Sequence, residues 1–323
     1  MVKIKCAVVG GSGYIGGELL RLLLSHPHVD LVAITANELA GETIAKVHPN
    51  LSHINRIFNP LGDVNNADVL FLALPHGSAV EFVKRFPDKI IIDTSADFRW
   101  QNTVDKHSIF CYGLPELFRT EIKTARNIAA PGCFATAAIL SIYPLVAEKL
   151  AEDIIINAVT GSSGSGIKPK DKAHHPLRAD SFFAYELFTH RHIPEIKQTI
   201  KNKTSQEINM IFQPHSGPFI RGIYATSIIK LRHEITKIQL LTIFKNFYAG
   251  EYFIRFPEAI PNIKWVKHSN FCDISVETQG KTAIIITTID NLLKGGAGQA
   301  IQCFNIMHGL AETLGLTVCA ANP

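Results

Sequence analysis

The sequence predicts an α/β protein in two parts, a doubly wound parallel sheet followed by an α+β part with a mostly antiparallel sheet. Over about the first 130 residues, short apolar runs alternate with amphipathic helical stretches, the pattern of parallel strands joined by crossover helices. A glycine-rich turn joins the first apolar run to the first helical stretch. Beyond Cys133 the apolar runs are longer and richer in β-branched residues, as in an antiparallel sheet faced by helices.

The individual elements follow from the hydrophobic periodicity. In the first part we expect strands at 3–10, 31–35, 68–74, 89–94 and 126–130, and helices at 14–25 and 77–86. In the second part we expect strands at 154–159, 208–212, 222–231, 271–277 and 283–289, and helices at 194–201, 238–249 and 297–312. We therefore assign 1–133 to one domain and 134–296 to a second, with 297–323 packing back on the first.

The turn after the first strand has the features of a dinucleotide site. It reads Gly-Gly-Ser-Gly-Tyr-Ile-Gly-Gly from residue 10 to residue 17. Glycines let backbone N–H groups approach a pyrophosphate, and the N-terminus of the following helix offers it a positive end. This order predicts a Rossmann-type nucleotide-binding domain rather than a mere flexible turn. The expected cofactor contacts are Gly10, Ser12, Gly13, Tyr14, Ile15 and Gly16.

The tip of the second strand indicates which dinucleotide binds. An NAD site usually has an acidic residue there, hydrogen-bonded to the ribose. Here the tip is Thr35, followed by Asn37 and Glu38. A short neutral side chain leaves room for a 2′-phosphate, so NADP(H) is the expected cofactor and Thr35 its expected contact. No arginine stands at the tip to clamp that phosphate, and Glu38 is close enough to oppose it.

Two further strand ends carry polar clusters. In a doubly wound sheet, ligands bind at the carboxyl ends of the strands. Pro75, His76 and Gly77 are therefore expected near the cofactor. Asp97 and Arg99 follow the next strand, and either they lie near the substrate or they form a local ion pair. The loop before the last helix also contributes expected cofactor contacts, at Asn291, Lys294 and Gly295.

Cys133 has the context of a catalytic nucleophile. It lies between a short strand and an apolar helix expected at 135–143, which Pro144 should end. At a helix N-terminus the unpaired N–H groups and the macrodipole favour the thiolate over the thiol. Pro131 and Gly132 allow the tight turn that exposes the sulfur. The alternative is a small buried hydrophobic residue, the commonest role of an intracellular cysteine.

A thiol that attacks a carbonyl needs a group to move protons, and His190 and His192 are the candidates. On a strand, residues two apart share a face, so both could face the same cleft while Arg191 points elsewhere. We prefer His192 as the catalytic one, and His190 would then be structural. Glu195 either orients a histidine or is a first-turn acid that satisfies the helix dipole.

Anion-binding groups are expected in two more places. The loop at Ser162, Ser163 and Gly164 offers hydroxyl and N–H donors, for cofactor at Ser162 and Gly164 and for substrate at Ser163, unless it is only a connector. Arg221 begins a strand and suits bidentate capture of a carboxylate or phosphate, although a salt bridge is an equal alternative.

The composition excludes several classes of function. The net charge is only +4 and the basic residues are scattered, so no nucleic-acid partner is expected. No apolar run is long enough to span a membrane, and the first residues form a strand rather than a signal peptide, so a cytoplasmic protein is expected. The six cysteines lack paired or metal-ligand spacing and should be reduced thiols. No metal site is expected.

Together these stretches resemble the N-acetyl-gamma-glutamyl-phosphate reductases of arginine biosynthesis. The resemblance spans nearly the whole chain and follows the family's order: the glycine loop, 75–77, 131–137, 161–166, 190–195, 221–223 and 290–295. It implies that Cys133 forms a thioester with a gamma-acyl phosphate, a small-molecule substrate. A hydride from NADPH then releases the semialdehyde. It also implies a homodimer or homotetramer assembled through the second domain.

Two departures keep alternatives open. The family commonly has Tyr-Pro after the cysteine, where this chain has Phe134-Ala135. The stretches 47–51, 173–179 and 312–316 also resemble a sister branch that reduces a carrier-linked aminoadipyl phosphate in lysine biosynthesis. Lys168, Lys170, Lys172 and Arg178 could read an acidic carrier, but the arginine-pathway substrate is preferred. A related semialdehyde or aldose-phosphate dehydrogenase, or a non-catalytic NADP-binding regulator, are the remaining alternatives.

Overall fold

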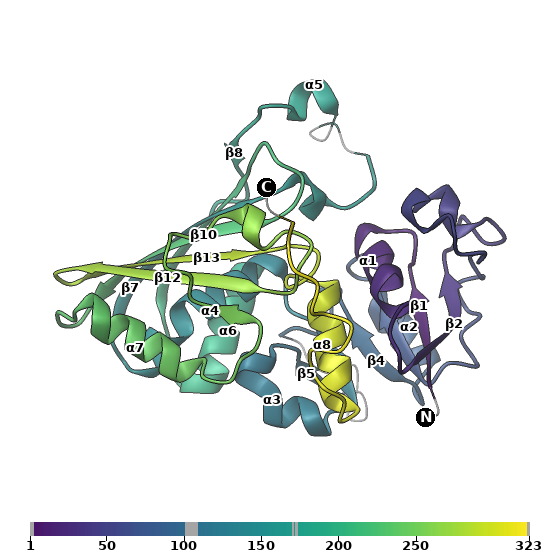
Figure 1. Ribbon diagram of the computed structural model, residues 1–323, viewed down its shortest axis with the longest axis horizontal. Helices are drawn as coiled ribbons and strands as arrows, with labels where there is room; N and C mark the ends of the chain where they lie inside the picture. The colour runs from purple at the N-terminus through teal and green to yellow at the C-terminus, as the bar shows by residue number, and fades with distance from the viewer. Residues whose placement is uncertain (1–2, 101–108, 170, 172–173, 322–323) are drawn as a thin grey trace. The chain divides into compact units, whose positions relative to one another are not determined.

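A computed structural model describes residues 3–100, 109–169, 171 and 174–321 of the chain. The chain divides into two compact units (Figure 1). The first unit contains residues 1–132 and 296–317, and the second contains residues 133–295 and 318–323. Each is described by itself.

The first unit is built on a six-stranded sheet in which every neighbouring pair is parallel. The order is β2-β1-β3-β4-β6-β5. β1 and β3 are adjacent and the chain continues outward from them in both directions, which makes this a doubly wound sheet whose ligand-binding edge lies at the strands' carboxyl ends. The strands are β1 (Ile4–Val9), β2 (Val29–Thr35), β3 (Val69–Leu72), β4 (Ile90–Asp93), β5 (Phe110–Tyr112) and β6 (Asn127–Ala129).

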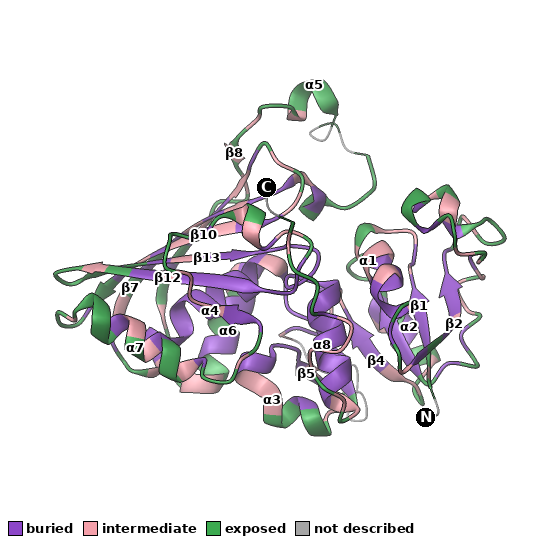
Figure 2. Cartoon of the chain, in the orientation of Figure 1, coloured by how far each residue is buried: buried purple, intermediate pink, exposed green. Residues whose placement is uncertain are grey.

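Helices from both ends of the chain complete the first unit. They are α1 (Tyr14–Leu23), α2 (Ala79–Arg85), α3 (Pro115–Thr124) and α8 (Ala297–Met307), with two 3-10 turns, η1 (Ile44–Lys46) and η2 (Pro49–Leu51). Although α8 is distant in sequence, it contacts α1, α3 and β4, and it is buried along nearly its whole length (Figure 2). His26 Nε2 and Asn305 Oδ1 meet at 3.0 Å beyond the end of α1 and bind the two helices together.

The second unit contains a mixed, mostly antiparallel sheet of seven strands, in the order β11-β12-β13-β10-β7-β9-β8. Only the β7–β9 and β11–β12 pairs are parallel. The predicted fold class is therefore confirmed. The strands are β7 (Ala151–Thr160), β8 (Phe183–Ala184), β9 (Asn209–Ser216), β10 (Ile223–Leu231), β11 (Ile254–Arg255), β12 (Cys272–Gln279) and β13 (Thr282–Ile289).

Helices cover one face of this sheet (Figure 1). α4 (Cys133–Ala147) contacts β7, β10 and β13, α6 (His192–Thr204) packs on α4, and α7 (Lys237–Phe247) contacts β12 and α4. Because α4 lies between the sheet and other helices, it is apolar on all sides rather than amphipathic. The shorter helical elements are η3 (Ser162–Ser165), α5 (His175–Arg178) and η5 (Ile263–Trp265).

The opposite face of the sheet carries a row of isoleucines. The strand register pairs Ile211 with Ile155, Ile155 with Ile228, and Ile228 with Ile284. Because side chains alternate between faces, the four point to the same side, away from the buried Ile154 and Ile156. Ile155, Ile211 and Ile284 each expose between 38% and 43% of their surface.

The prediction that Pro144 ends its helix was wrong. α4 starts at Cys133 and runs to Ala147 with Pro144 inside it. A proline in a helix leaves the carbonyl four residues earlier without its usual donor. Here that carbonyl belongs to Leu140, and it accepts a hydrogen bond of 2.7 Å from the hydroxyl of Tyr248. This tertiary hydrogen bond satisfies the carbonyl, so the helix continues through the proline.

Other differences are smaller. The last helix ends at Met307 rather than at residue 312, and Gly309 follows in the left-handed region. We did not predict α3 or β5. Within the described residues, no helix combines the length and the apolar character needed to cross a bilayer.

Candidate active site

The glycine loop of the first unit has the close contacts that a phosphate-binding turn requires. Gly10 has a φ of 85°, and a Cβ there would lie 2.5 Å from the carbonyl oxygen of Ala73. A Cβ on Gly16 would lie 2.5 Å from the carbonyl oxygen of Gly10. Only glycine fits at either position. No side chain caps the N-terminus of α1, so its first N–H groups suit an anionic ligand, with Ser12, Gly13, Tyr14 and Ile15 part-exposed beside them.

At the tip of β2, the side chain of Thr35 does not lie where a cofactor contact was expected. The backbone carbonyl of Thr35 accepts hydrogen bonds from the N–H groups of Gly10 and Gly11, at 3.1 and 2.8 Å. Its side chain is fully buried, and no described residue bonds the hydroxyl. Thr35 therefore supports the glycine loop through its backbone and does not present an exposed hydroxyl to a ribose. The exposed polar side chains at this tip are Asn37 and Glu38.

Asp97 braces the loop at 75–77. Its two carboxylate oxygens accept hydrogen bonds from the N–H groups of Gly77 and Ala79, at 2.7 and 2.9 Å. His76 Nδ1 accepts a further one from the N–H of Ala96, at 2.9 Å. The ends of β3 and β4 are thus joined, while Pro75, His76 and Gly77 stay exposed as a cofactor contact would require.

Arg99 bonds to the protein's own backbone. It is only 9% exposed, and its guanidinium donates to the carbonyls of Ala130 and Thr94, at 2.9 and 3.0 Å. These two hydrogen bonds tie the ends of β4 and β6 together, and the role of Arg99 in substrate binding stays a prediction. The sequence could not reveal these two contacts, since their acceptors are main-chain groups.

In the second unit, Cys133 is the first residue of α4 and is part-exposed. A thiol there experiences the positive end of a 15-residue helix, which favours the thiolate. Phe134, the next residue, is buried, and its ring lies 5.7 Å from that of His190 and 6.1 Å from that of His192. The structure therefore brings together the three residues that we predicted as thiol and proton carriers.

The two histidines are not on a strand, as we had expected. His192 begins α6, and Pro194 lies in the first helical turn, where its missing N–H costs no hydrogen bond. The two rings are 4.7 Å apart, and His190 Nδ1 accepts a hydrogen bond from the backbone N–H of His192. Burial, and then the nearby Arg191, lower the pKa of His190 to about 4. His190 is therefore a neutral imidazole that supports the start of the helix.

Glu195 faces His192 from inside the fold. Its carboxylate Oε2 lies 4.0 Å from His192 Nε2, and both side chains are almost completely buried. A first-turn acid that served only the helix dipole would be exposed to solvent. This geometry favours the other alternative, in which Glu195 orients the imidazole of His192.

The loop from Asp290 to Gly295 holds the thiol's position. The buried Asp290 carboxylate accepts two hydrogen bonds from Arg221, each of 3.0 Å, and others from the N–H groups of His268, Leu292 and Leu293. At the end of this loop, a Cβ on Gly295 would lie 2.6 Å from the Cβ of Cys133. Gly295 therefore contacts the thiol residue itself, and Arg221 binds Asp290 rather than standing free for substrate.

Three more predicted ligand contacts are internal to the second unit. Asn291 Oδ1 accepts from the N–H of Gly222 at 2.7 Å, and Asn291 Nδ2 donates to Ser163 Oγ at 3.0 Å. Ser163 Oγ also donates to the carbonyl of Ile220. Lys294 is completely buried, with its ammonium 5.7 Å from the centre of the Phe253 ring. These three side chains are buried, whereas Ser162 is part-exposed and Gly164 is exposed.

Two of the four basic residues considered for carrier binding are described. Arg178 is part-exposed and donates to Ser181, Ser216 and Gly217 in the loops around it. Lys168 is exposed, and Lys170 and Lys172 lie outside the described residues.

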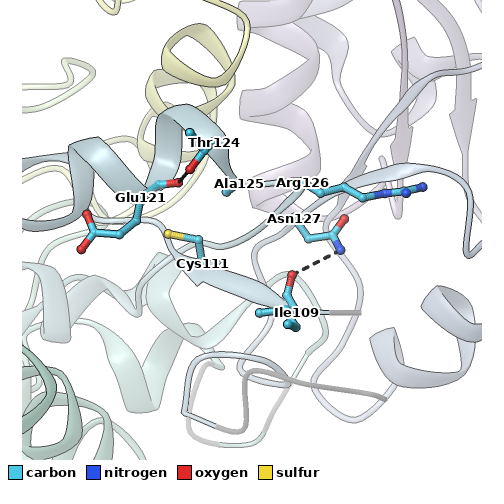
Figure 3. A pocket seen from close by; sticks show the side chains of 7 residues that line it. All are labelled: Ile109, Cys111, Glu121, Thr124, Ala125, Arg126 and Asn127. Atoms are coloured by element: carbon cyan, nitrogen blue, oxygen red, sulfur yellow. Dashed lines mark hydrogen bonds between the residues drawn. The ribbon is translucent and has the colours of Figure 1, made fainter. Parts of the chain in front are cut away.

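A hollow of about 360 Å³ lies elsewhere, in the first unit. Figure 3 shows its lining side chains, which come from β5, from the end of α3 and from the start of β6. It contains none of the predicted site residues. Its lining residues are Ile109, Cys111, Glu121, Thr124, Ala125, Arg126 and Asn127.

Tyr185 is a site residue that we did not predict. Burial raises the pKa of its phenol, and the charge of Cys133 raises it further. Its ring also meets that of His190 edge-on, 5.7 Å away. A neutral phenol is therefore held close to the thiol. No sequence motif distinguishes this tyrosine from a structural one.

Replacing Gly295 with alanine should displace Cys133, because the added methyl cannot fit 2.6 Å from its Cβ. A thiol moved away from the helix terminus loses thiolate character, so alkylation by iodoacetamide should slow by about tenfold. Mass spectrometry can follow Cys133 with the exposed Cys319 as an internal reference. Unchanged alkylation of Cys133 would show that the contact does not set its position.

The low pKa of His190 predicts a pH-dependent stability. The folded state holds this imidazole neutral down to about pH 4, whereas an unfolded histidine takes up its proton near pH 6.5. Between these values the unfolded state binds more protons, so stability falls as the pH falls. His190→Asn should abolish this contribution, on the order of 2 kcal/mol at pH 5. Urea unfolding at pH 7 and pH 5 measures it, with the exposed His53→Asn as control. Equal acid sensitivity of wild type and His190→Asn would contradict the assignment.

Comparison with known proteins agrees with this organisation. Residues 5–125 match the NAD binding domain of semialdehyde dehydrogenases, and residues 133–291 match the dimerisation domain. Two aspartate semialdehyde dehydrogenase structures share the fold at low identity. The Vibrio cholerae enzyme has a TM-score of 0.72 with 12% identity, over 96% of this chain and 99% of that one. The Candida albicans enzyme with NADP has a TM-score of 0.73 with 14% identity, over 94% and 98%.

Curated relatives are much more similar in sequence. N-acetyl-gamma-glutamyl-phosphate reductase from Methanocaldococcus jannaschii is 39% identical, over 98% of this chain and 99% of its own length. The protein of the same name from Methanosarcina barkeri is 40% identical, over 99% of this chain and 100% of its own length. The one from Phocaeicola vulgatus is also 40% identical, over 97% of this chain and 98% of its own length. The chain therefore belongs to the semialdehyde dehydrogenase family and, within it, to the N-acetyl-gamma-glutamyl-phosphate reductases.

Proposed function

We propose that this chain reduces N-acetyl-gamma-glutamyl phosphate to the 5-semialdehyde with NADPH, releasing phosphate, as a step of arginine biosynthesis. The observation that carries the proposal is the arrangement around Cys133. A thiol begins a long helix, and a buried His192–Glu195 pair packs against the next residue. The names of the relatives supply the substrate.

The chemistry assigns a role to each of these residues. The Cys133 thiolate attacks the acyl carbonyl, and the bond from that carbon to the phosphate oxygen breaks, leaving a thioester. NADPH supplies the hydride that reduces this thioester. The resulting thiohemiacetal oxygen takes up a proton and gives it back as the C–S bond breaks, and His192, oriented by Glu195, carries that proton. The neutral His190 is left to support His192.

The proposed cofactor site uses the glycine loop and the exposed loop at 75–77. NADPH is preferred over NADH because β2 ends at the neutral Thr35, where an NAD site usually has a carboxylate that hydrogen-bonds the ribose, and the first carboxylate beyond it is Glu38. Asn37 is the exposed neutral residue nearest to that end. A carrier-linked substrate is not favoured, because Arg178 is already engaged with neighbouring loops.

We further propose a homodimer formed through the isoleucine row of the second unit, or a tetramer built from such dimers. The row crosses β9, β7, β10 and β13 on the face opposite α4, and three of its members are substantially exposed. In a two-fold symmetric dimer the same face of both copies forms the interface. Such pairing would bury the isoleucine row.

Cys133→Ser should abolish the reaction, because a serine hydroxyl is a far weaker nucleophile at neutral pH. We expect a fall in kcat of roughly a thousandfold or more, with NADPH binding retained. The assay is NADPH formation from NADP, inorganic phosphate and N-acetylglutamate 5-semialdehyde, with aspartate semialdehyde as a competing substrate. Cys319→Ser, at an exposed thiol, serves as the matched control. A serine variant with wild-type turnover would eliminate the covalent route.

Ile284→Asp should dissociate the oligomer, because it places an unpaired charge within the proposed apolar interface. Ile238→Asp is the matched control, since Ile238 is 78% exposed on α7, which lies on the other side of the sheet. Sedimentation velocity should give the mass of the 35.6 kDa chain for the first variant and the wild-type oligomer for the second. Retention of the oligomer by Ile284→Asp would place the interface elsewhere.

A further inference from the structure

A segment of the first unit outside the glycine loop is folded against it. Residues 36–59 follow β2, and backbone hydrogen bonds between Ala36 and Asn59 and between Asn59 and Ile34 close the segment at its base. Between η1 and η2 stands His48, which is 8% exposed. Its N–H donates to the carbonyl of Ile44 and its carbonyl accepts from Leu51, both at 2.9 Å, so its backbone is fixed on both sides.

The imidazole of His48 reaches into the glycine loop. His48 Nε2 lies 2.7 Å from the carbonyl oxygen of Gly11. Because a carbonyl only accepts, Nε2 carries the proton in this hydrogen bond. The ring also lies against the first turns of α1, where a Cβ on Gly17 would come within 2.6 Å of Cε1 and 2.8 Å of Nδ1. The imidazole thus occupies the space that any side chain at residue 17 would fill.

This hydrogen bond fixes the direction of a peptide group in the glycine loop. The carbonyl of Gly11 and the N–H of Ser12 belong to one planar trans peptide, so they point in opposite directions. With the carbonyl held by His48, the N–H of Ser12 is directed away from the imidazole. The N–H of Gly11 is held in turn by the carbonyl of Thr35 at 2.8 Å. Glycine has little intrinsic preference among backbone conformations. Without these contacts the peptide could therefore turn its carbonyl toward an anion.

We propose that His48 is a positioning residue for the dinucleotide site. It keeps the glycine loop in the conformation that presents N–H groups, rather than a carbonyl oxygen, to the diphosphate of the cofactor. The inference rests on the proposed cofactor site and adds to it a residue that lies outside the glycine motif. Its consequence is preorganisation, so removing the imidazole should weaken binding of the cofactor and leave the thiol chemistry intact.

The first test compares His48→Ala with His48→Gln. Alanine removes the donor, and the dissociation constant for NADPH, measured by titration of its fluorescence, should rise about tenfold or more, as expected for one lost hydrogen bond. The KM for NADP should rise in parallel, with kcat and the KM for semialdehyde within about twofold of wild type. Glutamine keeps an N–H donor and should recover most of the affinity. His53→Ala, at an exposed histidine of the same segment, is the control.

The second test is Gly17→Ala, which leaves His48 in the sequence but takes its space. The clash with a buried ring outweighs the better helix propensity of alanine, so the melting temperature should fall to about that of His48→Ala. The displaced imidazole should weaken NADPH binding by about tenfold, as His48→Ala does. Gly17→Ala thus tests whether the position of the ring, and not only its presence in the sequence, is required for affinity.

Unchanged NADPH affinity in both His48→Ala and Gly17→Ala would overturn the inference, as would a glutamine variant as weak as the alanine one. The proposed function fails separately, if the wild-type protein binds NADPH but does not oxidise the semialdehyde in the presence of phosphate. The two failures are distinguishable because the titrations require binding only, whereas the activity assay requires Cys133.

Discussion

The carboxylate of Asp290 is the group on which the geometry of the candidate active site depends. It is completely buried, and a buried charge is tolerated only when it is paired and hydrogen-bonded. Arg221 supplies the opposite charge, and three backbone N–H groups complete the set of donors. The loop that follows brings the backbone of Gly295 against Cys133. The Arg221–Asp290 ion pair therefore anchors the loop that contacts the thiol residue.

Burial also divides the work between two chemically identical side chains. His190 and His192 have rings 4.7 Å apart and share the apolar surface of Phe134. His190 uses Nδ1 to accept from the backbone of its neighbour, and burial keeps it neutral. His192 instead faces the buried carboxylate of Glu195, with Nε2 4.0 Å from Oε2. The two histidines therefore have different partners although they lie side by side, and this difference is the basis for proposing different roles for them.

Local sequence was sufficient for much of this structure. The glycine loop, the strands of the first sheet other than β5 and the turn at Cys133 were predictable because each depends on a few consecutive residues. Arg99, Arg221 and Asn291 looked like ligand contacts because an unpaired polar side chain near a site suggests one. Their actual partners are backbone groups or acids that the fold brings together from distant parts of the chain. The same holds for Pro144, whose place within a helix depends on Tyr248, and for His48, whose imidazole meets Gly11 across 37 positions.

The discontinuous first unit has a consequence for biosynthesis. Its sheet is made of residues that precede Cys133, but α8, buried along nearly its whole length, is translated only after residues 133–295 of the second unit. As the polypeptide leaves the ribosome, the apolar surface that α8 will cover on α1 and α3 stays exposed until α8 itself has emerged. The first unit can therefore complete its fold only after those 163 inserted residues have been made.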